Sequence, residues 1–196
     1  MKVLIACEFT GTVRDAFIAR GHDATSCDLL PSETPGPHYR GDVRDILGGT
    51  WDLMIAHPPC QYLCASGMHW TTRGKRDPVL TEEALDFVRM LMLAPIPRKA
   101  IENSKGAISG RIRKPDQIIQ PYQFGHDASK ETHLWLEGLP MLKATKYIEP
   151  RIIDGRKRWA NQCDSGQNKL APSADRWKLR SATYAGIAAA MADQWG

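Results

Sequence analysis

Two short runs of residues carry the clearest chemistry in this sequence. Residues 58–60 are two prolines followed by a cysteine, and residues 102–103 are a glutamate followed by an asparagine. Each run follows a short apolar segment typical of a buried strand. The fixed φ angles of Pro58 and Pro59 orient the next side chain before any reaction occurs, which favours a reactive thiol at Cys60 over simple packing. Cys60 is therefore a candidate nucleophile.

The elements around these runs alternate between strand and helix. Strands are predicted at residues 3–6, 23–29, 51–56 and 99–101, and helices at residues 13–19 and 81–93, the second with Thr81 as its N-cap. Residues 117–120 and 133–136 favour late strands in a hairpin, and residues 184–194 a final helix. This order predicts an α/β fold with a Rossmann-like, doubly wound, mostly parallel sheet. Ligands bind such sheets at the carboxyl ends of the strands, where Asp28, Cys60 and Glu102 are expected.

Length and composition indicate one globular domain. The chain has 196 residues and no apolar run near the roughly 20 residues that span a bilayer, so no membrane association is expected. The N-terminal apolar run is too short for a signal peptide. Five cysteines, an odd number without framework spacing, favour reduced thiols and a cytoplasmic location.

Positive charge is concentrated in two segments, although the net charge is only +4. Residues 151–180 hold eight Lys and Arg against three Asp, together with Trp159 and Trp177. A second cluster consists of Lys105, Arg111, Arg113 and Lys114. Either cluster is a solvated surface or a contact for nucleic-acid phosphates, with the tryptophans able to stack on bases.

The first strand and turn are compatible with a nucleoside-containing cofactor. Residues 7–11 lack the complete Gly-x-Gly-x-x-Gly pattern of a dinucleotide site and the lysine of a phosphate-binding loop. Asp28 follows Gly11 by about 17 residues at the end of the next strand, where a carboxylate can accept hydrogen bonds from a ribose diol.

A metal site is a weaker interpretation of the same region. His57, Cys60, Cys64 and His69 are possible zinc ligands, but their spacing matches no common zinc motif. The zinc-dependent nucleobase deaminases require a His-x-Glu and a Pro-Cys-x-x-Cys motif, neither of which is present. We therefore expect no metal, and Cys64 is interpreted as packing in the loop after Cys60.

Together these residues resemble a known family. The run Pro-Pro-Cys-Gln at residues 58–61, with Glu-Asn at residues 102–103, is similar to the two signature motifs of cytosine-5 DNA methyltransferases. Phe9-x-Gly11, Asp28 and Gly-Asp-Val at residues 41–43 resemble the cofactor motifs of that family in the same order. The resemblance covers about residues 1–136 and is to a small, phage-like member.

The resemblance implies a reaction and a set of site residues. Cys60 would add to carbon 6 of cytosine, Glu102 would hydrogen-bond ring nitrogen 3 and the exocyclic amine, and Lys130 would stabilise the thiolate, whose pKa must fall toward 7. Asp28 would bind the ribose of S-adenosylmethionine, Asp42 its adenine amine, and Phe9 would pack on the adenine. The implied cofactor-binding residues are Cys7, Glu8, Phe9, Gly11, Asp28, Leu29, Asp42, Val43 and Pro58. The implied substrate-binding or nucleic-acid-binding residues are Pro59, Gln61, Asn103, Lys105, Arg111, Arg113, Arg156 and Arg158.

The sequence departs from the family in three places and in its size. His57 stands where the family has glycine, Ser104 where it has valine, and residues 129–133 keep one cation of a Gln-x-Arg-x-Arg motif. We predict a catalytic domain at residues 1–140, a short basic segment at residues 141–183 in place of a target-recognition region, and a final helix at residues 184–196.

The resulting expectation is methylation of carbon 5 of cytosine in DNA with low sequence specificity. The alternatives are an inactive nucleic-acid-binding module and a modifier of single-stranded DNA or free cytosine nucleotides. A partner protein that supplies target recognition is a further expectation.

Overall fold

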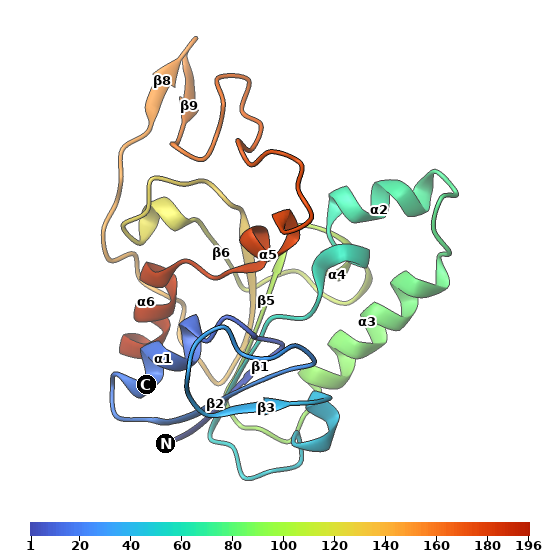
Figure 1. Ribbon diagram of the computed structural model, residues 1–196, viewed down its shortest axis with the longest axis vertical. Coiled ribbons are helices and arrows are strands. Elements are labelled where there is room, and N and C mark those ends of the chain that lie inside the picture. The colour runs from blue at the N-terminus through green and yellow to red at the C-terminus, as the bar shows by residue number, and fades with distance from the viewer.

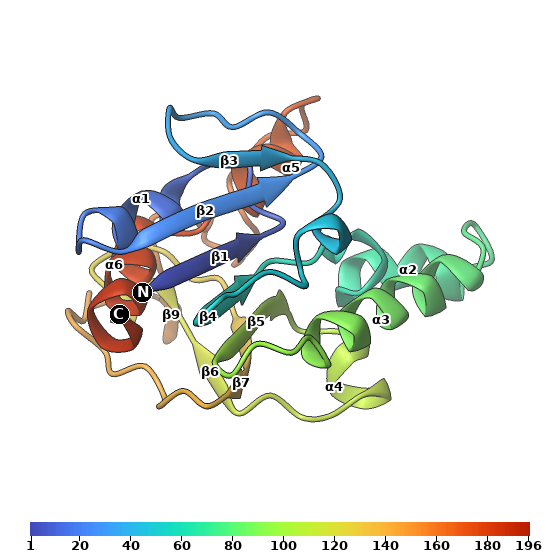
Figure 2. The same ribbon diagram turned by 90° about the horizontal axis from the view of Figure 1, so that it is seen from below.

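A seven-stranded, mostly parallel sheet forms the centre of the computed structural model, which describes residues 1–196 (Figure 2). Its strand order is β3-β2-β1-β4-β5-β7-β6. Strands β1 to β5 are parallel, whereas β7 is antiparallel to both β5 and β6. The strands are β1 (Lys2–Ala6), β2 (Asp23–Asp28), β3 (His38–Arg40), β4 (Leu53–Ala56), β5 (Lys99–Ser104), β6 (Gln117–Ile119) and β7 (Thr132–Glu137). The predicted Rossmann-like α/β class and the late hairpin are confirmed.

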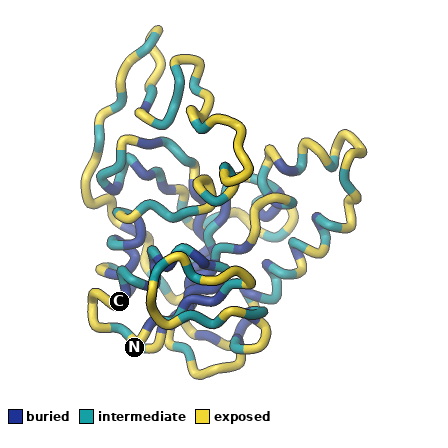
Figure 3. Tube along the Cα trace, viewed as in Figure 1, coloured by how far each residue is buried: buried dark blue, intermediate teal, exposed yellow.

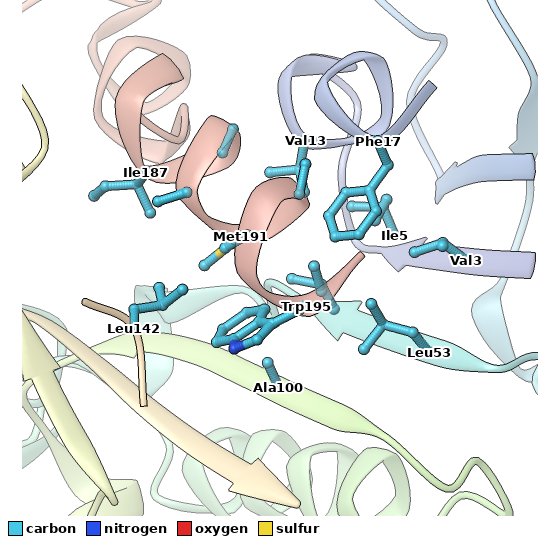
Figure 4. Packing of buried hydrophobic residues seen from close by; sticks show 14 of the residues in the cluster. Val3, Ile5, Val13, Phe17, Leu53, Ala100, Leu142, Ile187, Met191 and Trp195 are labelled. Carbon is cyan, nitrogen blue, oxygen red and sulfur yellow. The ribbon is translucent and has the colours of Figure 1, made fainter. Parts of the chain in front are cut away.

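Helices cover both faces of the sheet. Successive side chains of each strand point to opposite faces, so the strands contribute to two hydrophobic cores. Val3 and Ile5 of β1 pack beneath α1 (Thr12–Ile18) and α6 (Ala185–Trp195), where Trp195 is fully buried (Figure 4). Leu4 and Ala6 of the same strand face the opposite layer, which includes α3 (Val79–Met92). The final helix thus returns to complete the core of the sheet domain.

The segment between β7 and α6 forms an arm that projects from one end of the sheet (Figure 1). It contains the antiparallel pair β8 (Arg151–Ile153) and β9 (Arg156–Arg158) and the short helix α5 (Arg176–Ser181). Most of its residues are exposed (Figure 3). Trp159 fastens the arm: it is buried and stacked on Tyr122, with 4.2 Å between the ring centroids. Trp159 is therefore not free to stack on a base, contrary to the expectation.

Two predicted boundaries are wrong for identifiable reasons. Helix α3 begins at Val79, because the Asp77 side chain accepts the Val79 N–H at 2.9 Å and Pro78 suits a helix start. Thr81 is therefore a buried residue inside the helix and not its N-cap. Strand β5 continues to Ser104, so Glu102 lies within the strand and not after it.

The remaining short helices are α2 (Ala65–Thr72), α4 (Ala107–Arg111) and the 3-10 turns η1 (Val43–Asp45), η2 (Cys60–Tyr62) and η3 (Pro121–Gln123). None of these was predicted, because each is short and weakly amphipathic. No helix in the structure combines the length and apolar character needed to cross a membrane.

Candidate active site

The candidate site lies where the chain reverses its winding direction, between β1 and β4. Doubly wound sheets bind ligands at this point, beyond the carboxyl ends of the strands. The N–H of His57 donates to the carbonyl of Ala6 at 2.9 Å, which extends the pairing of β4 with β1 by one residue. The buried Asn103 donates its side-chain amide to the carbonyl of Pro58 at 2.8 Å. Two neighbouring strands therefore hold the loop that presents Cys60.

The three predicted catalytic residues line one small cavity of about 90 Å³. Cys60 comes from the loop after β4, Glu102 from β5, and Lys130 from the segment just before β7. The Lys130 ammonium donates to the carbonyl of Arg180 at 3.0 Å, so the C-terminal end of α5 closes one side. The other residues lining the cavity are Cys7, Glu8, Phe9, Thr10, His57, Pro58, Pro59, Asn103, Ser104, Arg180, Ser181 and Thr183.

Cys60 is held as a thiol in this arrangement. Its pKa is raised mainly by its hydrogen bond with Cys64, then by burial and by the negative charges of Cys64 and Glu102, while Lys130 opposes the rise. The expected fall of the Cys60 pKa toward 7 is therefore wrong for the resting protein. The charge of Lys130 lowers the pKa of Cys60, but the effects of Cys64, burial and Glu102 are larger.

Cys64 is the partner whose pKa is lowered. Its sulfur accepts the N–H of Gly67 at 3.3 Å as the N-cap of α2 and lies 3.3 Å from the hydroxyl of Ser66. The hydrogen bond from Cys60 is the largest cause that lowers the pKa of Cys64, to about 5. A position at a helix N-terminus also lowers the pKa of a thiol. The sequence analysis interpreted Cys64 as a packing residue only, whereas the structure places its sulfur in a hydrogen-bonded pair with Cys60.

Glu102 is paired with a residue that the sequence left unexplained. Its Oε2 atom lies 3.0 Å from Nδ1 of His57, and both side chains are almost entirely buried. Burial alone would raise the pKa of Glu102, but hydrogen bonding to His57 and the charges of Lys130, His57 and His133 lower it overall. Glu102 is therefore a buried carboxylate beside the thiol of Cys60.

A larger cavity of about 520 Å³ adjoins the first. Cys7 and Pro59 line both cavities, so the two spaces meet at the end of β1 and before Cys60. The predicted cofactor residues that line it are Cys7, Asp28, Leu29, Asp42 and Val43. Its volume lies within the roughly 300–1,000 Å³ common for small-molecule sites.

The two carboxylates of the larger cavity are not equally free. Asp28 accepts the N–H of Leu30 through Oδ1 at 2.9 Å, and burial raises its pKa. Asp42 caps η1 by accepting the N–H of Arg44 and also pairs with the Arg44 guanidinium at 2.7 Å. Asp28 therefore has the freer oxygen for a ribose hydroxyl.

Four of the predicted cofactor residues, Glu8, Phe9, Gly11 and Pro58, do not line the larger cavity, and Pro58 lines the smaller one. The carboxylate of Glu8 accepts the N–H groups of Val13 and Arg14 and so caps α1. Gly11 has a φ of +76°, and a Cβ there would come within 2.2 Å of Thr34. Phe9 lines the smaller cavity, 5.8 Å from Trp177 between ring centroids, and is not placed to pack on an adenine in the larger one. The aromatic rings that line the larger cavity are Tyr62 of η2 and Phe87 of α3.

Several basic residues predicted to contact nucleic acid are engaged within the protein. Arg111 pairs with Glu82 at 2.7 Å, and Arg113 pairs with Asp116 at 2.7 Å. Arg158 donates to the carbonyl of Asp164 at 2.8 Å. The remaining predicted contacts divide as follows: Pro59, Gln61 and Asn103 line the cavities, whereas Lys105 and Arg156 are exposed and line neither cavity.

The possible metal ligands do not converge. His57 faces Glu102, His69 is exposed on α2, and no group of three or more His, Cys, Asp or Glu side chains in the structure is placed to hold a metal ion.

Sequence reasoning missed residues that reach the site from distant elements. Arg180, Ser181 and Thr183 line the smaller cavity although they lie about 80 residues beyond Glu102. Leu80, Glu83, Ala84 and Phe87 of α3 line the larger one. The amphipathic pattern of α3 indicated a helix but not which cavity it covers.

The strand order, with its switch point between β1 and β4 and its antiparallel β7, is that of a Rossmann-like methyltransferase fold. Among solved structures, the chain is similar to a methyltransferase of Entamoeba histolytica, EhMeth, with a TM-score of 0.50 and 17% sequence identity over 76% of this chain. It spans 58% of the length of that protein. A mutant of Spodoptera frugiperda DNMT2 matches with a TM-score of 0.44 and 15% identity, over 80% of this chain and 57% of that one. No protein-family model matches the sequence, and no curated protein sequence does.

Proposed function

We propose that this protein transfers a methyl group from S-adenosylmethionine to carbon 5 of cytosine in DNA through a covalent adduct with Cys60. The observation that supports this most is the joining of the two cavities at Cys7 and Pro59. One holds a nucleophilic sulfur and a carboxylate, and the other has the volume and the Asp28 carboxylate suited to a nucleoside-containing cofactor. A methyl donor in one cavity and a base in the other would meet at this junction.

The larger cavity fits S-adenosylmethionine by its mixed lining. Apolar side chains from α3 and the loops cover its floor, Phe87 offers an aromatic face, and Asp28 offers an acceptor for the ribose. When bound there, the cofactor supplies the methyl group that carbon 5 receives.

The residues of the smaller cavity would activate the base. The Cys60 sulfur forms a bond to carbon 6 as its proton passes to the neighbouring Cys64 thiolate, and the electron pair of the 5,6 double bond shifts toward carbon 4 and ring nitrogen 3. Glu102 hydrogen-bonds the pyrimidine edge, and Lys130 stabilises the negative charge that develops. After methylation, the carbon 5 proton passes to water as the sulfur–carbon bond breaks, and the Cys60 thiolate that leaves recovers its proton from Cys64.

The substrate is proposed to be an unpaired or readily flipped cytosine. Extrusion from a duplex costs a few kcal/mol. The arm between β7 and α6 has only β8, β9 and α5 as regular elements, so it is a small surface with which to offset this cost. Single-stranded DNA and a free nucleotide therefore fit the same site, as does a duplex that a partner protein has opened.

Covalent trapping tests the proposal. The full chain is incubated with S-adenosylmethionine and single-stranded or duplex oligonucleotides containing 5-fluorodeoxycytidine, which blocks release of the adduct. A denaturation-resistant complex is expected with wild type and none with Cys60→Ser, while Cys163→Ser, a change in the exposed arm, leaves trapping intact. Binding without any adduct in the wild type would favour the alternative of a non-catalytic nucleic-acid-binding module, for which the raised pKa of Cys60 is the supporting observation.

A further inference from the structure

His57 occupies a fixed position at the edge of the smaller cavity. Its N–H continues the β4–β1 pairing, and the following Pro58 is held by Asn103 at 2.8 Å. The backbone at this residue therefore has little freedom. In the family that the sequence resembles this position is glycine, which has no side chain to contact Glu102.

The only polar contact of the imidazole is with Glu102. Nδ1 lies 3.0 Å from Oε2, the side chains retain 10% and 13% of their exposure, and Nε2 is buried with no hydrogen-bond partner in the protein. A buried histidine with a structural role ordinarily satisfies both ring nitrogens. Since an ionised carboxylate only accepts, Nδ1 carries the hydrogen, and Glu102 alone accounts for the ring orientation.

We propose that His57 is a positioning residue for Glu102: its Nδ1–H holds Oε2 and leaves Oε1 directed to the base. The effect of His57 on catalysis rests on the proposed function, but the contact between His57 and Glu102 is present whatever the reaction. The charged and titratable groups facing Glu102 are Cys60 from the β4 loop, Lys130 from the segment before β7, and His133 on β7. His133 is itself held by Glu131 and Ser109, so His57 supplies the side chain in direct contact with the carboxylate.

The test compares His57→Ala with His57→Asn, whose amide places a donor near the position of Nδ1. His69→Ala, an exposed histidine on α2, is the matched control. Titration of Glu102 is followed by the NMR signal of its side-chain carboxyl carbon, assigned by its loss in Glu102→Gln. The rate of covalent trapping by 5-fluorodeoxycytidine DNA is then measured across the same pH range, and folding of each variant is checked by thermal unfolding.

In His57→Ala the pKa of Glu102 is expected to rise by about one to two pH units, a tenfold to hundredfold gain in proton affinity. The acid limb of the trapping rate should move upward with it, whereas His57→Asn and His69→Ala stay near wild type. An unchanged Glu102 titration in a folded His57→Ala would overturn the inference. If wild type forms no adduct, the proposed function fails while the Glu102 titration still decides whether His57 controls this carboxylate.

Discussion

Replacing Cys60 by alanine is expected to raise the pKa of Cys64 from about 5 to about 6–7. The hydrogen bond from Cys60 is the largest cause of the lowered pKa. One hydrogen bond to a charged acceptor contributes about 1.5–3 kcal/mol, and each pH unit corresponds to about 1.4 kcal/mol, so its loss raises the pKa by about one to two units. The Gly67 N–H at 3.3 Å remains in place, so the value stays below that of a free thiol.

The ultraviolet absorbance of the thiolate, followed against pH, measures this change. Cys163 is first replaced by serine, because hydrogen bonding with Ser165 also lowers its pKa. Cys7 and Cys27 do not interfere, since burial raises the pKa of Cys7 and raises that of Cys27 to about 12. In this background the wild-type pair is expected to show one step below neutral pH, and Cys60→Ala should shift that step upward.

Cys64→Ala is the control that identifies the ionising group. It should abolish the step, and the pKa of Cys60 should fall toward its ordinary value because the negative neighbour and the hydrogen bond are gone. A step below neutral pH that persists in Cys64→Ala, or a midpoint that Cys60→Ala leaves unmoved, would refute the assignment of the charge to Cys64. The proton transfer proposed for the attack of Cys60 would then lack its acceptor.

Three further predictions concern the cofactor, acid stability and the arm. Asp28→Ala should weaken S-adenosylmethionine binding about tenfold to hundredfold by calorimetry, because one hydrogen bond to a charged acceptor is lost; unchanged affinity would exclude this carboxylate from the site. The lowered pKa of Glu102 stabilises the fold above its unfolded-state value of about 4.3, and this contribution is lost as pH falls through the folded-state pKa. Urea unfolding should therefore show a smaller loss of stability on acidification in Glu102→Gln than in wild type. Trp159→Ala should cost about 3–5 kcal/mol of unfolding free energy, whereas Trp177→Ala, at a half-exposed ring, should cost far less.

The sheet was predictable because each of its buried strands is marked by the apolar pattern of its own residues. Val3 to Ala6 and Leu53 to Ala56 are apolar on both faces, as a buried parallel strand requires, and Pro58 and Pro59 follow the second strand closely. Cys60 and Glu102 were predictable as a pair for the same reason, since parallel strands bring their carboxyl ends to one edge. The helix start at Val79 was missed because the Asp77 cap competed with the equally plausible Thr81.

The site residues that escaped prediction depend on contacts that no local pattern encodes. Arg180 reaches the smaller cavity only because the arm folds back over Lys130. Phe9 suggested an adenine contact by its position in the chain, but its ring turns to Trp177, and Phe87 on a different element faces the larger cavity. Side-chain direction at a strand end follows from the neighbours, which a single sequence does not reveal.

His57 shows that a departure from a familiar pattern carries information of its own. A glycine before the two prolines leaves the carboxylate of a neighbouring strand to be held by its surroundings or by the substrate. Histidine there supplies a buried donor 3.0 Å from Glu102, while Nε2 is left without a partner in the protein. An unpaired buried nitrogen costs free energy and persists where a function requires the group in that place. The arm is short and mostly exposed, so it offers few contacts with which to order the smaller cavity on binding. Fixing Glu102 in advance through His57 would provide that order within the sheet domain itself.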